Sequence, residues 1–129
     1  MDPKKKILII DDDSFLLDMY ALKFNQSNFS VTTALGPEPA LEKLHQGFVP
    51  DVVLLDIVMP VMDGFELMEK LKEENLATQS IFIILSNRGQ ASDIARGESL
   101  GAAGYIVKAS STPSEVIEKV NSIINNIKK

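Results

Sequence analysis

The sequence predicts an α/β domain in which helices cover both faces of a five-stranded parallel sheet. Five short runs rich in apolar and β-branched residues begin near positions 7, 31, 52, 81 and 104 of the 129-residue chain. The intervals between these runs carry apolar residues three and four positions apart, which is typical of helices packed on a core. A regular alternation of strands and helices favours βα units joined by right-handed crossovers, and hence a parallel, doubly wound sheet.

The polarity of the runs predicts the order of the strands. Runs 7–10, 52–55 and 81–85 are continuously apolar, as expected of parallel strands covered on both faces. Runs 31–34 and 105–107 are shorter or more polar, as edge strands tend to be. We therefore expect the order 2-1-3-4-5, which places the two more polar runs at the edges.

Composition limits the class of protein. The length fits one domain spanning residues 1–129. Cysteine is absent, so a reducing cytoplasmic location is expected. The 13 Lys and Arg residues against 18 Asp and Glu residues give a net charge of −5, which disfavours direct nucleic-acid binding. Apolar runs are far shorter than the roughly 20 residues that cross a bilayer, so membrane insertion is not expected.

The predicted helices differ in strength. Residues 112–115 supply an N-cap, a proline at the first helical position and a capping-box glutamate, followed by a long apolar stripe. The segment 90–100 is weaker, because Ile94 and Leu100 are the main large apolar residues expected to anchor it and Gly97 lies inside it. We expect this fourth helix to be the least firmly held.

Charged and polar side chains follow the predicted strands. Asp11 and Asp12 end the first strand, Asp56 ends the third, and Ser86 and Lys108 end the fourth and fifth. In an open α/β sheet, ligands bind beyond the carboxyl ends of the strands where the order reverses, here between strands one and three. Crowded carboxylates repel one another unless a cation is present, and Mg²⁺ suits a site made only of oxygen ligands. Such a site could place an aspartate as a nucleophile towards a phosphoryl group.

Short motifs recur at these strand ends in a fixed order. They are Ile-Ile-Asp-Asp at 9–12, Leu-Asp at 55–56, Met-Pro at 59–60, Met-Asp-Gly at 62–64, Leu-Ser at 85–86 and Gly-Tyr-Ile-Val-Lys at 104–108. Together they resemble the receiver domain of bacterial two-component response regulators, which has a flavodoxin-like (βα)5 fold. The resemblance extends over nearly the whole chain.

The resemblance implies a phosphorelay function with Mg²⁺ as cofactor. Asp56 would accept a phosphoryl group from a histidine kinase or a histidine phosphotransfer protein and would also ligate Mg²⁺. Asp12 would ligate the metal directly and Asp11 through water, and the main-chain carbonyl of Val58 would complete the protein ligands. Such a domain catalyses its own phosphorylation and dephosphorylation and is not a conventional turnover enzyme.

The resemblance also implies a switch. Lys108 would contact the phosphoryl group, the Ser86 hydroxyl would move towards it, and the Tyr105 ring would turn inward. The surface made by the fourth helix, fifth strand and fifth helix would then bind a downstream protein or output domain, which the sequence does not identify.

The chain departs from the family pattern after some of these positions. Ala109 stands where the family has a proline joined by a cis peptide, and a cis bond before a non-proline residue costs about 2.5 to 4 kcal/mol. Asn87 replaces a smaller residue. Val58 and Arg88 occupy positions that tune loss of the phosphoryl group in the family. We expect slow dephosphorylation, because Val58 cannot orient a water molecule and Arg88 can shield the phosphate.

The sequence is also compatible with other functions. A degenerate receiver would act as a binding module without accepting phosphate. An aspartate-nucleophile phosphohydrolase could use Asp11 and Asp13, but it leaves Asp56 unexplained. A flavin-binding module would have to place its phosphate against Asp11 and Asp12, which electrostatics opposes.

Several residues have simpler structural interpretations. Asp13 is expected at a helix start, where a carboxylate favours the helix dipole, and Asp63-Gly64 is expected to be turn or cap chemistry. His45 is expected on the surface near the end of the second helix, without a role as phosphodonor. Lys4 to Lys6 are expected to form a solvated leader.

Overall fold

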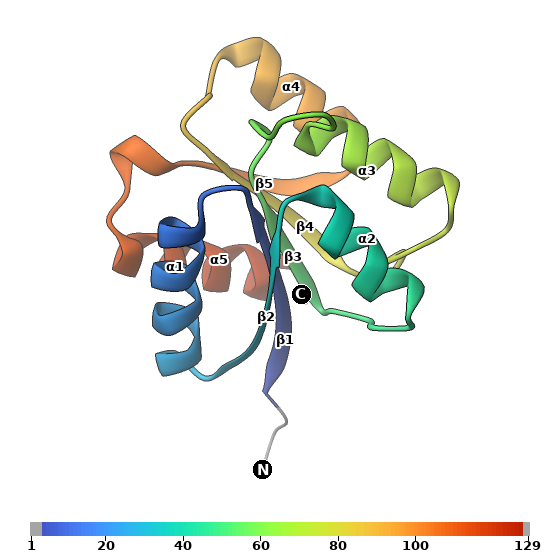
Figure 1. Cartoon of the computed structure of the whole chain (residues 1–129). Helices are drawn as coiled ribbons and strands as arrows, with labels where there is room; N and C mark the ends of the chain where they lie inside the picture. Colours follow the sequence, from blue (N-terminus) through green and yellow to red (C-terminus); the bar gives the residue numbers. More distant parts are fainter. Residues whose placement is uncertain (1–3, 128–129) are drawn as a thin grey trace.

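The structure, a computed structural model, describes residues 4–127 and contains one sheet of parallel strands in the order β2-β1-β3-β4-β5 (Figure 1). The strands are β1 (Lys5–Asp11), β2 (Phe29–Leu35), β3 (Val52–Leu55), β4 (Ile81–Ser86) and β5 (Ala102–Val107). The helices are α1 (Ser14–Gln26), α2 (Pro37–His45), α3 (Gly64–Glu73), α4 (Ala91–Ser99) and α5 (Pro113–Ile127), with a short 3-10 helix, η1 (Lys108–Ser110), after β5. The predicted fold class and strand order are confirmed.

The two faces of the sheet carry separate hydrophobic cores. Ile7 and Ile9 of β1 pack in the core that α1 and α5 cover, whereas Leu8 and Ile10 pack in the core that α2 and α3 cover. Figure 1 shows α1 and α5 together on one face and α2 and α3 on the other. Successive strand residues point to opposite faces, so a strand buried on both sides needs an unbroken apolar run.

Strand β1 begins before the apolar run from which it was predicted. β1 includes Lys5 and Lys6, which pair with Phe29 and Ser30 of β2. The Lys6 backbone N–H also donates to Asp51 Oδ2 at 2.8 Å. The expectation of a solvated leader is therefore wrong for Lys5 and Lys6, because backbone pairing with β2 continues the strand through charged residues. Lys4 is exposed and precedes the strand.

The predicted helix starts are confirmed. Asp13 Oδ1 accepts hydrogen bonds from two backbone N–H groups in the first turn of α1, at 3.0 and 3.1 Å. Asp63 and Glu66 exchange hydrogen bonds of 2.8 and 3.0 Å in a capping box at α3. Thr112 and Glu115 form the same arrangement before α5, at 3.2 and 2.8 Å. These contacts satisfy backbone donors that the first turn leaves unpaired.

Helix α4 is attached mainly by polar and close backbone contacts. Of its residues Ala91–Ser99, only Asp93 and Gly97 are buried. Ile94 is 40 % exposed, so its predicted role as an anchor is wrong, while Leu100 packs partly against the core. A Cβ atom on Gly97 would lie 2.6 Å from Ile84 Cδ1, so this glycine lets the helix approach β4 closely.

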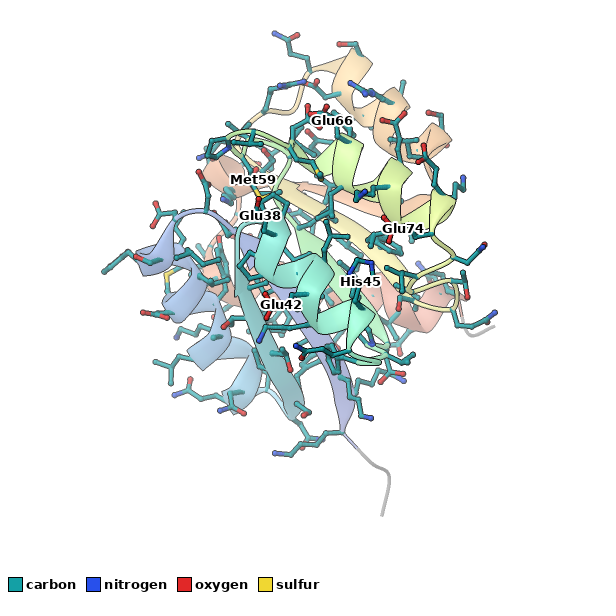
Figure 2. The ribbon with its side chains drawn as sticks, turned by 45° about the vertical axis from the view of Figure 1, so that its right-hand side comes forward. Glu38, Glu42, His45, Met59, Glu66 and Glu74 are labelled. Atoms are coloured by element: carbon teal, nitrogen blue, oxygen red, sulfur yellow. The ribbon has the colours of Figure 1, made fainter. Side chains whose placement is uncertain are left out.

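His45 lies at the end of α2 on the surface, as predicted. Its Nε2 atom is 2.5 Å from Glu74 Oε1, and Lys70 Nζ contacts the other carboxylate oxygen of Glu74 at 2.9 Å. Figure 2 shows His45 and Glu74 side by side, with Met59 near the opposite end of α2. Since Met59 belongs to the loop that follows β3, His45 is remote from the carboxyl end of that strand.

Within residues 4–127, no helix combines the length and the apolar character needed to cross a bilayer.

Candidate functional site at the carboxyl ends of β1 and β3

Three carboxylates meet where β1 and β3 end. Strand β1 pairs with β3, with Ile10 opposite Leu55, so Asp11 and Asp56 emerge at the same edge of the sheet. The Asp56 backbone N–H donates to the Ile10 carbonyl at 3.0 Å. Carboxylate oxygens of Asp11, Asp12 and Asp56 all lie within 4.8 Å of one another. Asp11 and Asp56 are buried, whereas Asp12 is exposed.

Lys108 reaches from the end of β5 into this cluster. Its Nζ atom donates to Asp11 Oδ2 at 2.7 Å and to Asp56 Oδ2 at 2.8 Å, and its side chain is only 8 % exposed. Burial lowers the pKa of Lys108, but its bonds to the two carboxylates outweigh burial and the pKa lies above the ordinary value. The ammonium group is therefore charged and fixed beside Asp56.

The pKa of Asp11 is raised above its ordinary value. Burial is the largest cause, and the charge of Asp56 adds to it. The hydrogen bonds from Lys108 and from the Asp13 backbone act in the opposite direction without cancelling it. A site that disfavours its own negative charge in this way gains from a bound cation.

Backbone N–H groups orient the two buried carboxylates. Asp56 Oδ1 accepts from the Val58 N–H at 3.0 Å, and Asp11 Oδ1 accepts from the Asp13 N–H at 3.0 Å. Each carboxylate thus has one oxygen on a loop N–H and the other on Lys108. This arrangement fixes both groups before any ligand arrives.

The cluster has the donor chemistry of a Mg²⁺ site. Its ligands are oxygens from a few carboxylates, one of them exposed to solvent, and Mg²⁺ prefers oxygen ligands and keeps several waters. Asp11, Asp12 and Asp56 are all brought together as the sequence predicts. The division into direct and water-mediated ligands, and the carbonyl of Val58 as a ligand, stay predictions.

The two predicted switch residues are linked through the backbone of Arg88. Ser86 is fully buried at the end of β4, and its Oγ accepts from the Arg88 N–H at 3.2 Å. The Tyr105 hydroxyl donates to the Arg88 carbonyl oxygen. Burial, followed by the charge of Asp93, raises the pKa of Tyr105 to about 12, so the hydroxyl keeps its proton at neutral pH.

Sequence reasoning missed the partner of Arg88. The guanidinium donates from Nε and Nη2 to Asp93 Oδ1, at 3.1 and 3.0 Å, and Asp93 Oδ2 accepts from the Gln90 N–H at 3.2 Å. An acidic residue in the first turn of a helix is a signal for capping. The ion pair itself depends on the path of the loop before α4, which the sequence does not specify.

The peptide bond between Lys108 and Ala109 is trans, as are all peptide bonds of the described residues. Lys108 still reaches both Asp11 and Asp56. A trans bond at this position is thus compatible with the predicted place of the lysine.

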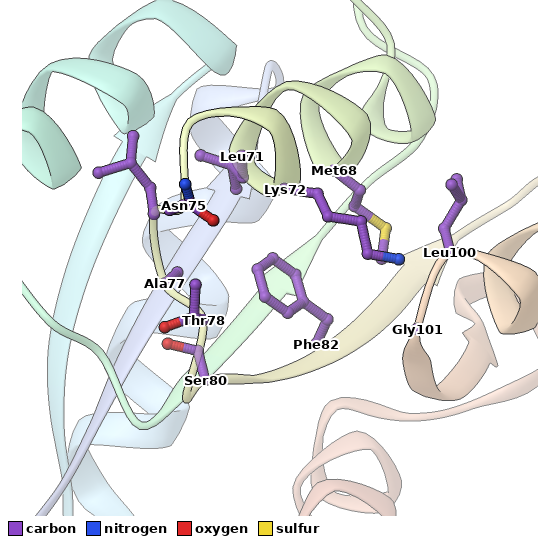
Figure 3. Close-up of a pocket in the computed structure, with 11 residues that line it drawn as sticks. Met68, Leu71, Lys72, Asn75, Ala77, Thr78, Ser80, Phe82, Leu100 and Gly101 are labelled. Atoms are coloured by element: carbon purple, nitrogen blue, oxygen red, sulfur yellow. The ribbon is translucent and has the colours of Figure 1, made fainter.

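The structure weakens the phosphohydrolase alternative. Asp13 caps α1 and is not part of the acidic cluster, so it does not form a pair of catalytic carboxylates with Asp11. A separate cavity of about 330 Å³ lies between α3, the start of β4 and the end of α4 (Figure 3). Its described lining, which includes Met68, Phe82 and Leu100, contains no carboxylate. The cavity is therefore separate from the acidic cluster at the carboxyl ends of β1 and β3.

Comparison with known proteins agrees with this geometry. The family model of the response regulator receiver domain matches residues 7–121. The probable transcriptional regulator ycf27 of Guillardia theta is 31 % identical over 129 residues, which is 100 % of this chain and 49 % of that protein. The chain spans about half the length of the curated relatives it matches.

Solved receiver structures have the same fold. A CheY-like receiver domain protein from Methanospirillum hungatei JF-1 has a TM-score of 0.83 and 27 % identity, with 95 % of each chain covered. The BeF3-activated DrrB receiver domain has a TM-score of 0.79 and 25 % identity, covering 95 % of this chain and 98 % of that one. The family match covers most of the chain, and the matched range includes the acidic cluster, Ser86 and Lys108. The chain therefore belongs to the response regulator receiver domain family.

Proposed function

We propose that this domain is a phosphorylation switch in which Asp56 accepts a phosphoryl group. The observation that carries the proposal is the position of Lys108, whose Nζ lies between Asp11 and Asp56 in a cluster of three carboxylates. A structural aspartate at a strand end needs neither a buried lysine nor two further acidic groups around it. A phosphoacceptor needs both, because the lysine and a cation held by the acidic groups neutralise charge on the transferred group.

The proposed transfer begins with attack by an Asp56 carboxylate oxygen on the phosphorus of a phosphohistidine. The new bond joins that oxygen to phosphorus, while the bond from phosphorus to the imidazole nitrogen breaks and its electron pair returns to the ring. Lys108 neutralises negative charge on the transferred group. Ser86 supplies a hydroxyl donor once it leaves the Arg88 N–H.

Asp11, Asp12 and Asp56 would hold Mg²⁺, which would supply charge neutralisation at the phosphoryl oxygens. The donor set supports this assignment, since every candidate ligand atom is an oxygen. The raised pKa of Asp11 supports it as well, because a cation at this position relieves the cost of burying the carboxylate.

The proposed output is a change in the surface formed by α4, β5 and α5. Ser86 and Tyr105 both contact Arg88, so movement of the Ser86 hydroxyl towards a phosphoryl group releases the loop that Tyr105 also holds. Helix α4 buries little apolar surface and is suited to move between two positions.

The proposed upstream partner is a histidine kinase or a histidine phosphotransfer protein in the cytoplasm. The proposed downstream partner is a protein or an output domain. The curated relatives, which include a probable transcriptional regulator, are about twice as long as this chain and support an output function outside the receiver. We assign no direct nucleic-acid binding to the receiver itself, given its net charge of −5.

The phosphoryl lifetime is proposed to be long. Val58 is 51 % exposed and apolar, so it has no group that could orient an attacking water. Decay of the phosphorylated protein within seconds would contradict this part of the proposal.

The function is tested by labelling with acetyl phosphate in Mg²⁺ and by titration with beryllofluoride, a phosphoryl mimic. We expect labelling of the wild type, amide chemical-shift changes around Asp56 and Tyr105, and loss of labelling in Asp56→Asn. Asp18→Asn is the matched control, since Asp18 is an exposed aspartate of α1 outside the acidic cluster. The BeF3-activated DrrB receiver domain supports the choice of probe.

Three outcomes would decide against the proposal. Equal labelling of Asp56→Asn and the wild type would exclude Asp56 as the acceptor. No response to beryllofluoride in the wild type would favour a degenerate receiver that acts only as a binding module. Turnover of a small phosphate ester in Mg²⁺ would instead revive an enzymatic function.

A further inference from the structure

Arg88 connects three parts of the switch region through three different groups. Its backbone N–H donates to Ser86 Oγ at 3.2 Å, and its carbonyl accepts the Tyr105 hydroxyl. Its guanidinium donates to Asp93 in the first turn of α4. The end of β4, strand β5 and helix α4 are thus joined at one residue.

Asp93 is a preformed acceptor for this guanidinium. It is only 7 % exposed, one of few charged residues buried among residues 4–127. One carboxylate oxygen takes both hydrogen bonds from Arg88, and the other takes the Gln90 N–H. The pair ties the guanidinium to α4 while the domain is unphosphorylated.

A phosphoryl group on Asp56 would offer Arg88 a second acceptor. A phosphoryl group brings up to about two negative charges and three acceptor oxygens, and the arginine fork matches phosphate geometry. Arg88 is two residues from Ser86, whose hydroxyl the proposed function turns towards that group. The side chain of Arg88 is about half exposed, so it can change partners without leaving a packed core.

We propose that Asp93 is a positioning residue that competes with the phosphoryl group on Asp56 for the Arg88 guanidinium. This inference rests on the proposed function and adds a regulatory element to the same site. Asp93 holds Arg88 on α4 before phosphorylation. Transfer of the guanidinium to the phosphoryl oxygens then removes one of the polar contacts that attach α4.

The competition sets the lifetime of the phosphorylated state. In hydrolysis, a water oxygen attacks phosphorus and the bond from phosphorus to Asp56 breaks. The carboxylate keeps the electron pair, and the proton of the water passes to solvent as phosphate leaves. A guanidinium on the phosphoryl oxygens occupies the approach of that water. Asp93 therefore shortens the lifetime by drawing Arg88 away.

The test compares the wild type with Asp93→Asn, Arg88→Gln and the double variant. Beryllofluoride is titrated in Mg²⁺ with amide chemical shifts as the readout, and decay of acetyl-phosphate-labelled protein is then measured. Asparagine keeps an acceptor for the Gln90 N–H but removes the charge that holds Arg88. We expect Asp93→Asn to bind beryllofluoride about three- to fivefold more tightly, the size of effect of a partly exposed ion pair, and to lose phosphate more slowly by a similar factor.

The remaining variants separate positioning from stability. Arg88→Gln should bind beryllofluoride more weakly than the wild type, and adding Asp93→Asn to it should change nothing further. Glu98→Gln removes the same charge from an exposed position of α4 and should match the wild type. Amide chemical shifts of residues 87–90, measured without beryllofluoride, should change in Asp93→Asn and Arg88→Gln but not in Glu98→Gln.

Three outcomes would overturn the inference. They are an unchanged beryllofluoride affinity in Asp93→Asn, an unchanged affinity in Arg88→Gln, and an equal effect of Asp93→Asn with and without Arg88. If the wild type binds beryllofluoride and Asp93→Asn and Arg88→Gln bind it with the same affinity as the wild type, the inference is overturned and the proposed function still stands. A wild type that does not bind overturns both.

Discussion

Gly64 lies against the backbone of Asp56. A Cβ atom built on Gly64 would be 2.4 Å from the Asp56 carbonyl oxygen and 2.7 Å from the Ile57 Cα. The Gly64 N–H also donates to the Ile57 carbonyl at 3.0 Å. The first residue of α3 thus supports the segment that carries Asp56, the proposed phosphoacceptor, and the Met-Asp-Gly motif has a packing role as well as a capping role.

Gly64→Ala is expected to displace Asp56. Because the clash involves backbone atoms, it cannot be relieved by a side-chain rotation, and we expect a loss of about 1 to 3 kcal/mol in the free energy of unfolding. The Asp56 amide chemical shift should change and beryllofluoride binding should weaken. Asp63→Ala is the control: it should lose about 1 kcal/mol through the missing cap and retain beryllofluoride binding. Equal binding by Gly64→Ala and the wild type would contradict the supporting role.

Lys108→Met is expected to destabilise the domain most strongly when Mg²⁺ is absent. The change leaves Asp11 and Asp56 buried without their shared cation, and removing one partner of a buried ion pair costs about 3 to 5 kcal/mol. Mg²⁺ should restore part of the loss, because it replaces the missing positive charge. Denaturant unfolding with and without Mg²⁺ measures both values.

The exposed Lys119 provides the comparison for that experiment. Lys119→Met removes the same charge from an exposed residue whose ammonium donates to the Ser111 hydroxyl, and it should change stability by less than about 0.5 kcal/mol. A loss in Lys108→Met as small as that in Lys119→Met would mean that Lys108 is not needed to neutralise the two carboxylates.

The sequence was sufficient to predict the fold and the acidic site because both follow from simple rules. Continuous apolar runs identify the strands covered on both faces, and the carboxyl ends of neighbouring parallel strands must meet. Asp11 and Asp56 therefore meet wherever the loops run, whereas Lys108 follows β5, two strands from β3, and reaches them through its long side chain. The Arg88–Asp93 pair and the approach of Gly64 to Asp56 depend on loop paths, and β1 extends through Lys5 because backbone pairing tolerates charged side chains.

Mg²⁺ is expected to stabilise the domain through Asp12. A ligand that binds only the folded state stabilises it by about 1.4 kcal/mol at ten times its dissociation constant. Asp12→Asn should lose most of this gain but retain or increase stability without Mg²⁺, because it removes one of the clustered negative charges. Thermal unfolding with and without Mg²⁺ checks the prediction, with Asp18→Asn as the control. The same Mg²⁺ response in Asp12→Asn would exclude Asp12 as a ligand.

Val61→Gly is expected to stabilise the loop after Asp56. Val61 has φ 71°, a left-handed conformation that costs a β-branched residue about 1 to 2 kcal/mol. It forms a tight turn in which the Met62 N–H donates to the Pro60 carbonyl at 2.8 Å. The side chain is 99 % exposed, so its removal loses no packing. After the entropic cost of glycine, the net gain should be up to about 1 kcal/mol.

Val49→Gly is the control for this substitution, because Val49 is also an exposed loop valine but does not have a positive φ. It should reduce the free energy of unfolding, since glycine there adds only freedom to the unfolded chain. A loss of stability in both variants would show that the conformation of Val61 is not strained.

Tyr105 is expected to ionise well above the ordinary value in the folded domain. Burial, with the charge of Asp93 as a second cause, raises its pKa to about 12, and burial also raises the pKa of Tyr20, the other tyrosine. In the unfolded chain both phenols lose their protons near pH 10. Between about pH 10 and 12 the unfolded state therefore binds fewer protons than the folded state, and the free energy of unfolding falls as the pH rises.

Ultraviolet titration of the phenolate band measures these ionisations directly. Tyr105→Phe should remove the transition at about 12 and make the fall in stability above pH 10 shallower, whereas Tyr20→Phe should leave the Tyr105 transition in place. A Tyr105 transition near pH 10 would mean that its hydroxyl is solvated and does not hold the Arg88 carbonyl. Helix α4 would then be joined to β5 without the contact that couples Tyr105 to Ser86.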